Sequence, residues 1–225
     1  MKIPGDRGHK GVDMFVHTRM TANPFTVTPD DTVPTADALM KKHGIRHLPV
    51  VAGGKVVGVI SKGDVAAALP SLATSLSASE ITYLVNKLKV DKAMSHHPIT
   101  IGPDALLEEA AVLMRDNKIE MLPVVDGTEL IGVITESAIF DAFVELLGFR
   151  ERGTRLTLEA TDEPGVIAKV GETMAHHRAN IGHIAVYRGE PKSTFLIGVN
   201  TTNTDDLEAE LAAEGITVLG KLVNP

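Results

Sequence analysis

The sequence predicts an α/β (α+β) protein in which two βαββα copies pack together with pseudo-twofold symmetry and a βαββαβ unit follows. The first observation is an internal repeat, because residues 20–65 shifted by 74 positions fall without a gap on residues 94–139. The second is the strand–turn–strand pattern in each copy, and the third is a change of periodicity after Gly148. A repeat this regular implies one supersecondary unit used twice and packed on itself.

Copy one (residues 20–65 and their continuation) is expected to hold short extended pieces, a helix, a hairpin and a second helix. These elements are predicted at residues 15–16, 25–27, 33–43, 48–51 with 55–60, and 62–69. The hairpin prediction rests on Gly53-Gly54, which tolerate the positive φ of a tight primed turn; Asp126-Gly127 serves copy two (residues 94–139) in the same way. The Ser-rich stretch Ser71–Ser79 separates the copies, and Ser77 with Glu80 resembles a capping box that opens another helix.

Beyond Gly148 the pattern becomes βαββαβ, a ferredoxin-like order. We expect a strand at 156–160, a turn at 162–165, a helix from Val166, strands at 181–187 and 195–199, a helix after Thr204 and a last strand at 216–219. Thr204 is the expected N-cap, and Gly215 is expected to end the last helix. The domain boundaries follow as a flexible leader at 1–13 with Met14 as an alternative start, copy one at 14–78, copy two at 79–149 and the third domain at 150–225.

Composition excludes several classes of function. The chain has 225 residues, a net charge of −7 and no cysteine, which favours a cytoplasmic protein and argues against broad nucleic-acid binding. No apolar run approaches the roughly 20 residues of a membrane span, and no signal peptide is evident. Among the nine histidines, His43 and His47 have i,i+4 spacing, but Gly44 breaks the helix that would align them, and the adjacent pairs point to different faces. No catalytic constellation is present. We therefore expect no metal, no membrane partner and no enzyme activity.

The duplicated unit resembles a pair of CBS domains, also called a Bateman module, over roughly residues 14–147. The resemblance rests on the proline-containing first strand, the Leu-Pro-Val-Val strand and the last strand running into Ser/Thr-x-x-Asp. The C-terminal unit resembles an ACT domain through residues 162–165 after its first strand and Asn180-Ile181 at the start of its second. The order CBS–CBS–ACT at this length is similar to the acetoin-utilisation protein B family.

The resemblance implies that adenosyl compounds bind in clefts between the copies. In copy one, Ser61 begins a helix whose free N–H groups suit a phosphate. The resemblance assigns the ribose hydroxyls to Asp64, and nearby cations can counter phosphate charge. The residues expected to bind the nucleotide are Asn23, Thr26, Val27, Arg46, His47, Pro49, Ser61, Lys62 and Asp64. The alternative is that Ser-x-x-Asp is only a helix-capping device.

Copy two departs from this pattern. Ala138 stands where the ribose aspartate is expected, and Arg46, His47 and Lys62 become Glu120, Met121 and Glu136 under the same shift. We predict one competent cleft centred on Asp64 and a degenerate second cleft. The residues assigned to the degenerate cleft are Thr100, Met121, Thr135 and Ala138. The alternative is that Arg46/Glu120 and Lys62/Glu136 form salt bridges across the pseudo-twofold, which stabilise by about 0–1 kcal/mol.

The ACT resemblance implies an amino-acid site where the first helix begins and meets strand two of a neighbouring subunit. The residues assigned to this site are Pro164, Gly165, Val166, Asn180 and Ile181. A unit that only mediates dimerisation is the alternative. The expected function is a non-enzymatic, homodimeric regulator that senses AMP, ADP or ATP and acts on an unknown enzyme, in acetoin or acetate metabolism. The alternative function is an assembly subunit with vestigial ligand sites.

Overall fold

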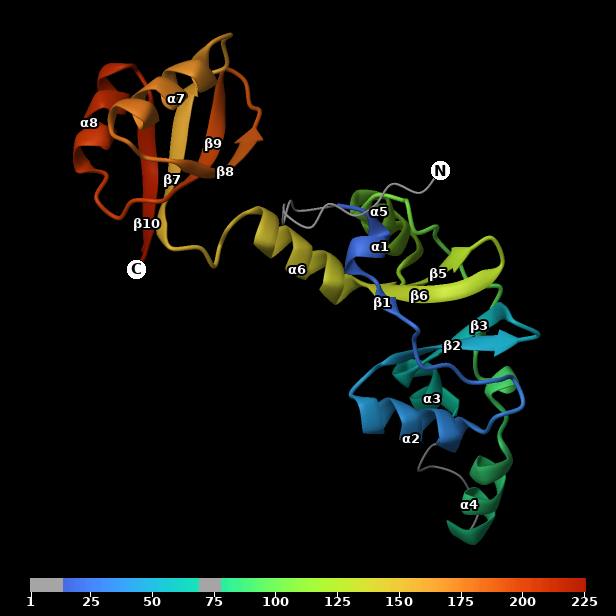
Figure 1. Ribbon diagram of the computed structural model, residues 1–225. Coiled ribbons are helices and arrows are strands. Elements are labelled where there is room, and N and C mark those ends of the chain that lie inside the picture. Colours follow the sequence, from blue (N-terminus) through green and yellow to red (C-terminus); the bar gives the residue numbers. More distant parts are fainter. Residues whose placement is uncertain (1–13, 69–77) are drawn as a thin grey trace. The chain divides into compact units, whose positions relative to one another are not determined.

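The computed structural model describes residues 14–68 and 78–225 and divides the chain into two compact units, residues 1–140 and 141–225 (Figure 1). The expected leader, most of the Ser-rich stretch and the predicted cap Ser77 lie outside the described residues. Each unit is treated separately below.

Copy one follows the predicted order with two corrections. Its elements are α1 Val16–Arg19, β1 Thr21–Ala22, α2 Val33–His43, β2 His47–Ala52, β3 Lys55–Ser61 and α3 Lys62–Ala68. The helix prediction at 33–43 is confirmed, and Thr32 Oγ1 caps it by accepting the Thr35 N–H. The predicted extended piece at 15–16 is wrong for Val16, which begins a helix. The predicted strand at 25–27 is also wrong, because only Val27 forms an isolated bridge and the strand lies earlier in the chain.

The predicted hairpins are confirmed in both copies. Gly53 and Gly54 have φ of 57° and 79°, as a primed turn requires, and β2 pairs with β3 on either side of them. Gly127 has φ 60° in the equivalent turn. Copy two and its approach contain α4 Ala78–Lys87, a 3₁₀ turn Val90–Lys92, β4 Ser95–His96, α5 Leu107–Asn117, β5 Met121–Asp126, β6 Glu129–Thr135 and α6 Glu136–Leu146.

The copies exchange their first strands. The two three-stranded sheets have the orders β1-β6-β5 and β2-β3-β4, so the lead-in segment of each copy (residues 20–27 and 94–101) begins in the other copy's sheet. Thr21 pairs with Val133, and Ser95, 74 residues later, pairs with Val59, again a shift of 74. The register of the exchanged strands therefore obeys the pseudo-twofold symmetry, and each copy contributes one strand to the sheet of the other copy.

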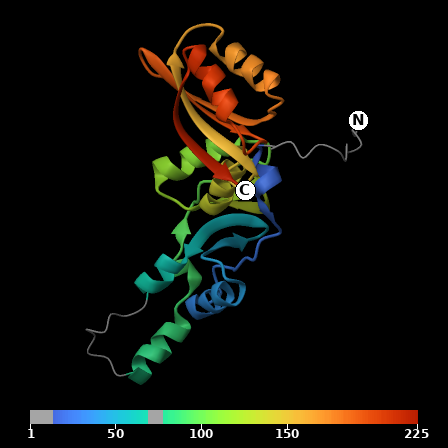
Figure 2. The same cartoon turned by 90° about the vertical axis from the view of Figure 1, so that its left-hand side faces the viewer.

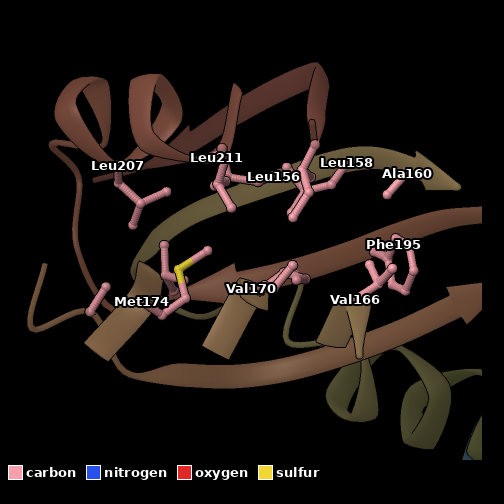
Figure 3. Close-up of a cluster of buried hydrophobic side chains, with 13 residues drawn as sticks. Leu156, Leu158, Ala160, Val166, Val170, Met174, Phe195, Leu207 and Leu211 are labelled. Atoms are coloured by element: carbon pink, nitrogen blue, oxygen red, sulfur yellow. The ribbon is translucent and has the colours of Figure 1, made fainter. Parts of the chain in front are cut away.

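The second unit has the predicted βαββαβ order. Its elements are β7 Gly153–Thr161, α7 Val166–His176, β8 Ile181–Tyr187, β9 Lys192–Val199, α8 Asp205–Ala213 and β10 Thr217–Asn224, and its sheet order is β10-β7-β9-β8. Both helices cover one face of this antiparallel sheet (Figures 1 and 2). The sheet and helices enclose an apolar core that includes Leu158, Val170 and Leu211 (Figure 3).

Two details of this unit differ from expectation. Thr204 occupies the N-cap position of α8, but its side chain makes no cap bond and its hydroxyl donates to Glu208 Oε1 instead. The last strand continues to Asn224, because β10 pairs with β7 past a register shift between Val218 and Gly220. Gly215, with φ 79°, follows the end of α8 as predicted.

Candidate functional site

A cavity of about 410 Å³ lies between the two copies, within the size range of small-molecule sites. From copy one it is lined by Thr21–Phe25, by Gly44–His47 and by Pro49. Copy two contributes Glu120, Met121, Val133, Thr135, Glu136 and Ser137. The strand exchange explains this mixed lining, because the lead-in segment of copy one runs along β6 of copy two.

The structure groups the predicted residues differently from their order in the sequence. The cavity brings together Asn23, Arg46, His47 and Pro49, which we expected beside Asp64, with Met121 and Thr135, which we expected in the second cleft. The predicted residues that do not line this cavity are Thr26, Val27, Ser61, Lys62, Asp64, Thr100 and Ala138. Thr26 lines a separate open hollow of about 600 Å³ near the hairpin turns, and Val27 is buried.

The shift of 74 residues identifies the equivalent region on the other side of the pseudo-twofold. It carries Thr21–Phe25 onto Ser95–Ile99 and Gly44–His47 onto Lys118–Met121. It also relates Thr135, Glu136 and Ser137 to Ser61, Lys62 and Gly63. By this symmetry we expect Asp64 to lie beside the lead-in segment of copy two, residues 94–101. Sequence reasoning missed this exchange, since a repeat shows that two units are alike but not which strands they trade.

Asp64 is held firmly at the start of α3. Its Oδ2 accepts the backbone N–H of Ser61 at 2.8 Å and the Ser61 hydroxyl at 2.7 Å, while Ser61 Oγ accepts the Asp64 N–H at 3.1 Å. These hydrogen bonds support the alternative that Ser-x-x-Asp caps helix α3. No described residue, however, donates a hydrogen bond to Asp64 Oδ1. In copy two, Thr135 Oγ1 accepts the Ala138 N–H at 3.3 Å, and the alanine supplies no carboxylate to complete the arrangement.

Glu120 of copy two lies close to two basic side chains of copy one. Its Oε2 lies 3.7 Å from Arg46 Nη2 and 3.8 Å from His47 Nε2, so the predicted Arg46/Glu120 pair is confirmed. The other predicted pair, Lys62/Glu136, is not among the ion pairs of residues 14–68 and 78–225, so that part of the alternative is not supported. Burial lowers the pKa of His47 and outweighs the opposing charge of Glu120; Arg46 lowers it further and Asp64 raises it.

The predicted ACT residues fall at two separate places in their unit. Pro164, Gly165 and Val166 line an open cavity of about 650 Å³ that also contains Arg188. Gly165 has φ 99°, a conformation that favours glycine at the start of α7. Asn180 lines a different cavity of about 110 Å³. Ile181 packs against the core, so a single unit does not bring the five residues together.

The described histidines are engaged in other ways. His176 Nδ1 and His177 Nε2 lie 2.9 Å from the two carboxylate oxygens of Glu210, and His183 lies 3.0 Å from Glu151. Across residues 14–68 and 78–225, no group of three His, Cys, Asp or Glu side chains is arranged to hold a metal ion. None of the helices in these ranges is long and apolar enough to cross a membrane.

Comparisons with known proteins agree with this architecture. The CBS domain family model matches residues 13–71 and 90–145, and the ACT domain model matches residues 154–215. Inosine-5'-monophosphate dehydrogenase of Korarchaeum cryptofilum is 36% identical over 141 residues, which are 62% of this chain but only 26% of that enzyme. The chain therefore spans about a quarter of that relative and shares only its CBS part.

Two solved structures are similar to the CBS part. A candidate acetoin utilization protein (AcuB) from Vibrio cholerae is 31% identical, with a TM-score of 0.49, over 60% of this chain and 93% of that one. CBSX2 in complex with AMP is 28% identical, with a TM-score of 0.50, over 60% of this chain and 99% of that one. CBS and ACT domains are regulatory domains. By its family matches, this chain belongs to the CBS domain family, with two CBS copies followed by an ACT domain.

Proposed function

We propose that this protein is a non-enzymatic regulator that binds an adenine nucleotide between its two CBS copies, in the cleft that contains Asp64. The observation that supports this proposal most directly is the geometry of the Asp64 carboxylate. Two hydrogen bonds from Ser61 fix Oδ2, and the described residues leave Oδ1 available for a ribose hydroxyl. The first helical turn of α3 adds N–H groups that suit a phosphate. The AMP complex of the similar CBSX2 supports an adenine nucleotide as the ligand class.

The cavity of about 410 Å³ is the degenerate cleft in this proposal. Ala138, which does not line it, stands at the position equivalent to Asp64, and Glu120 and Glu136 line the cavity together with Arg46 and His47. Arg46 offsets the charge of Glu120, but Glu136 has no ion-pair partner among the described residues and repels a phosphate, so a nucleotide gains less there than in the cleft that contains Asp64. Because each lead-in segment belongs to the other copy's sheet, a ligand in either cleft contacts both copies. Occupancy then changes the relation of the copies only if the ligand binds two arrangements with different affinity.

Calorimetric titration of AMP, ADP, ATP and adenosine into the full chain tests the proposal. We expect one nucleotide site per chain, weakened about tenfold or more by Asp64→Ala, which removes a charge-assisted acceptor. Thr135→Ala is the control, because it removes the copy-two hydroxyl that is equivalent to the Ser61 hydroxyl, just before α6, and does not touch Asp64. Unchanged binding by Asp64→Ala, or two equal sites in the wild type, contradicts the proposal.

A second function, an assembly subunit with vestigial sites, is favoured by one observation. Three side chains that could serve a ligand already have partners in the chain: Arg46 and His47 with Glu120, and Asp64 with Ser61. This function predicts no thermal shift with adenine nucleotides or amino acids, together with a stable partner enzyme in a native pull-down. A nucleotide-dependent shift that Asp64→Ala abolishes argues against it.

The ACT unit extends the first proposal to an amino-acid ligand. The cavity at Pro164–Val166 offers the N-terminus of α7 and the Arg188 side chain, both suited to a carboxylate. Asn180 and Ile181 lie elsewhere in the same unit, so a shared site needs strand β8 of a second copy. A homodimer is therefore part of the proposal, as are cytoplasmic action on a partner enzyme and a link to acetoin or acetate metabolism.

A further inference from the structure

A cavity of about 110 Å³ lies within the second unit, at one end of the ACT sheet. Strand register places four of its lining residues in one row across all four strands: Leu222 of β10, Arg155 of β7, Gly198 of β9 and His183 of β8. Leu156 and Ile197, which adjoin the row in β7 and β9, are buried in the core. Because successive side chains of a strand point to opposite faces, the row lies on the face of the sheet away from the core.

Gly198 leaves a hollow in this row. Its two neighbours across the sheet, Arg155 and His183, have long side chains, whereas the glycine has none. A Cβ at Gly198 would lie 2.8 Å from His183 Cδ2, so the ring would have to move. A glycine inside a strand often marks a point where another group approaches the backbone closely. The floor of the cavity is therefore the bare backbone of β9, between a guanidinium and an imidazole.

The segment that connects α6 to β7 (residues 147–152) covers His183. Glu151 Oε2 lies 3.0 Å from His183 Nε2, and a Cβ at Gly148 would overlap the same ring. Asn224 of β10 donates a side-chain N–H to the Glu151 carbonyl oxygen at 2.7 Å. The His183 side chain is consequently only 17% exposed. These contacts hold the connecting segment against the end of the sheet and give the cavity its outer wall.

The cavity carries positive charge without a matching anion from the described chain. Arg152 and Arg155 both line it, and neither forms an ion pair among residues 14–68 and 78–225. The carboxylate that lines it, that of Glu151, already faces His183. Arg155 is half-buried, so its charge is screened less than that of a fully exposed arginine. A planar guanidinium in this position fits the two oxygens of a carboxylate.

The size and the walls of the cavity narrow the class of ligand. A water molecule occupies about 30 Å³ of the liquid, so the cavity holds roughly three or four groups of that size. Leu147, Phe149 and Leu222 add apolar walls, which suit a carbon chain better than the further oxygens of a phosphate. We propose that this cavity binds a short monocarboxylate, such as acetate or propionate, whose carboxylate pairs with Arg155. The site is separate from the nucleotide cleft and from the cavity at Pro164–Val166.

NMR titration of the isotope-labelled full chain tests the proposal, with sodium acetate replacing sodium chloride at constant ionic strength. We expect saturable shifts of the His183 and Gly198 amide signals. Arg155→Gln should weaken this binding about tenfold or more, because it removes a charge-assisted hydrogen bond, and Arg155→Lys should restore part of the affinity. Arg178→Gln is the charge-matched control, because Arg178 lies in the same unit and does not line the cavity.

A pair of glycine variants tests the site without changing its charge. Gly198→Ala should abolish acetate binding, because the new methyl group fills the floor of the cavity. Gly220→Ala should leave binding intact, since a Cβ there would meet nothing closer than 3.8 Å and Gly220 does not line the cavity. Acetate should also slow amide hydrogen exchange at Glu151, because a ligand that touches the connecting segment and the sheet stabilises their contact.

Several outcomes would contradict the carboxylate site. Absence of saturable shifts in the wild type, or equal affinity in Arg155→Gln, overturns it. Weaker binding in Arg188→Gln with native binding in Arg155→Gln would place acetate in the cavity at Pro164–Val166 instead. If inorganic phosphate or hexanoate binds as tightly as acetate, the ligand class is wrong. Failure of the proposed nucleotide site leaves this inference standing, since Asp64 does not line the cavity.

Discussion

Equivalent residues of the two CBS copies differ in side-chain chemistry although the copies share one backbone fold. His47 and Met121 occupy equivalent positions, and both line the cavity between the copies. His47 has a side chain only 17% exposed and a lowered pKa, so the fold favours its neutral form despite Glu120 at 3.8 Å. The sequence predicted a loss of cationic character at this position from copy one to copy two, which the lowered pKa of His47 does not support. It did not reveal that burial keeps the histidine neutral.

The lowered pKa makes a prediction about stability and pH. Between the usual histidine pKa of about 6.5 and its lower value in the fold, the unfolded chain binds more protons, so stability falls as pH decreases through that window. We expect His47→Met to flatten this dependence, because methionine does not titrate and fits the equivalent position in copy two. Urea unfolding of both proteins at pH 5.5 and 7.5 measures how the free energy of unfolding depends on pH. An equally steep loss of stability at pH 5.5 in the variant would show that another group is responsible.

At the scale of elements, the exchange of first strands depends on two glycines. A Cβ on Gly58 would lie 2.5 Å from Met94 Sδ and 3.0 Å from the Ser95 carbonyl oxygen. A Cβ on Gly132 would lie 2.6 Å from Met20 Sδ and 3.1 Å from the Thr21 carbonyl oxygen. Only a missing side chain lets a neighbouring strand approach so closely. The repeat showed these glycines to be equivalent, but their purpose became visible only with β1 and β4 in place.

Gly58→Ala should therefore loosen β4 from β3. We expect a destabilisation of about 1–3 kcal/mol from overpacking, with faster amide exchange at His97, whose N–H donates to the Val57 carbonyl. Urea unfolding and amide hydrogen exchange provide the two measurements. Gly102→Ala is the control, because a Cβ there meets nothing within 4 Å. Native exchange rates at His97 in Gly58→Ala would mean that the strand pairing tolerates a side chain.

For the whole molecule, the chain carries separate apolar cores in its two compact units. Leu48 belongs to a core formed with the first CBS copy, and Leu158 belongs to the ACT core between the sheet and both helices (Figure 3). Each side chain has an exposed fraction of 0%. Separate cores favour units that unfold as separate cooperative transitions.

Truncation of one core tests that separation. Leu158→Ala should destabilise the ACT transition by about 2–5 kcal/mol, through lost burial and a new cavity, and leave the CBS transition in place. Leu48→Ala should do the reverse. Differential scanning calorimetry of the full chain resolves the two transitions. Equal displacement of both by either variant would show that the units unfold together.

The sequence by itself determined the two βαββα copies, the βαββαβ unit, the hairpin turns at Gly53-Gly54 and the helix at 33–43, because local patterns and turn chemistry specify these elements. It also identified Ser61–Asp64 and the loss of that carboxylate in copy two. Only the tertiary structure decided that the copies trade their first strands, which places Asn23 and Arg46 in one cavity with Thr135 and leaves Asp64 outside that cavity. The physical reason is that either of the two equivalent sheets can satisfy the backbone hydrogen bonds of a two-residue strand. Only packing between the copies therefore determines which sheet the strand joins.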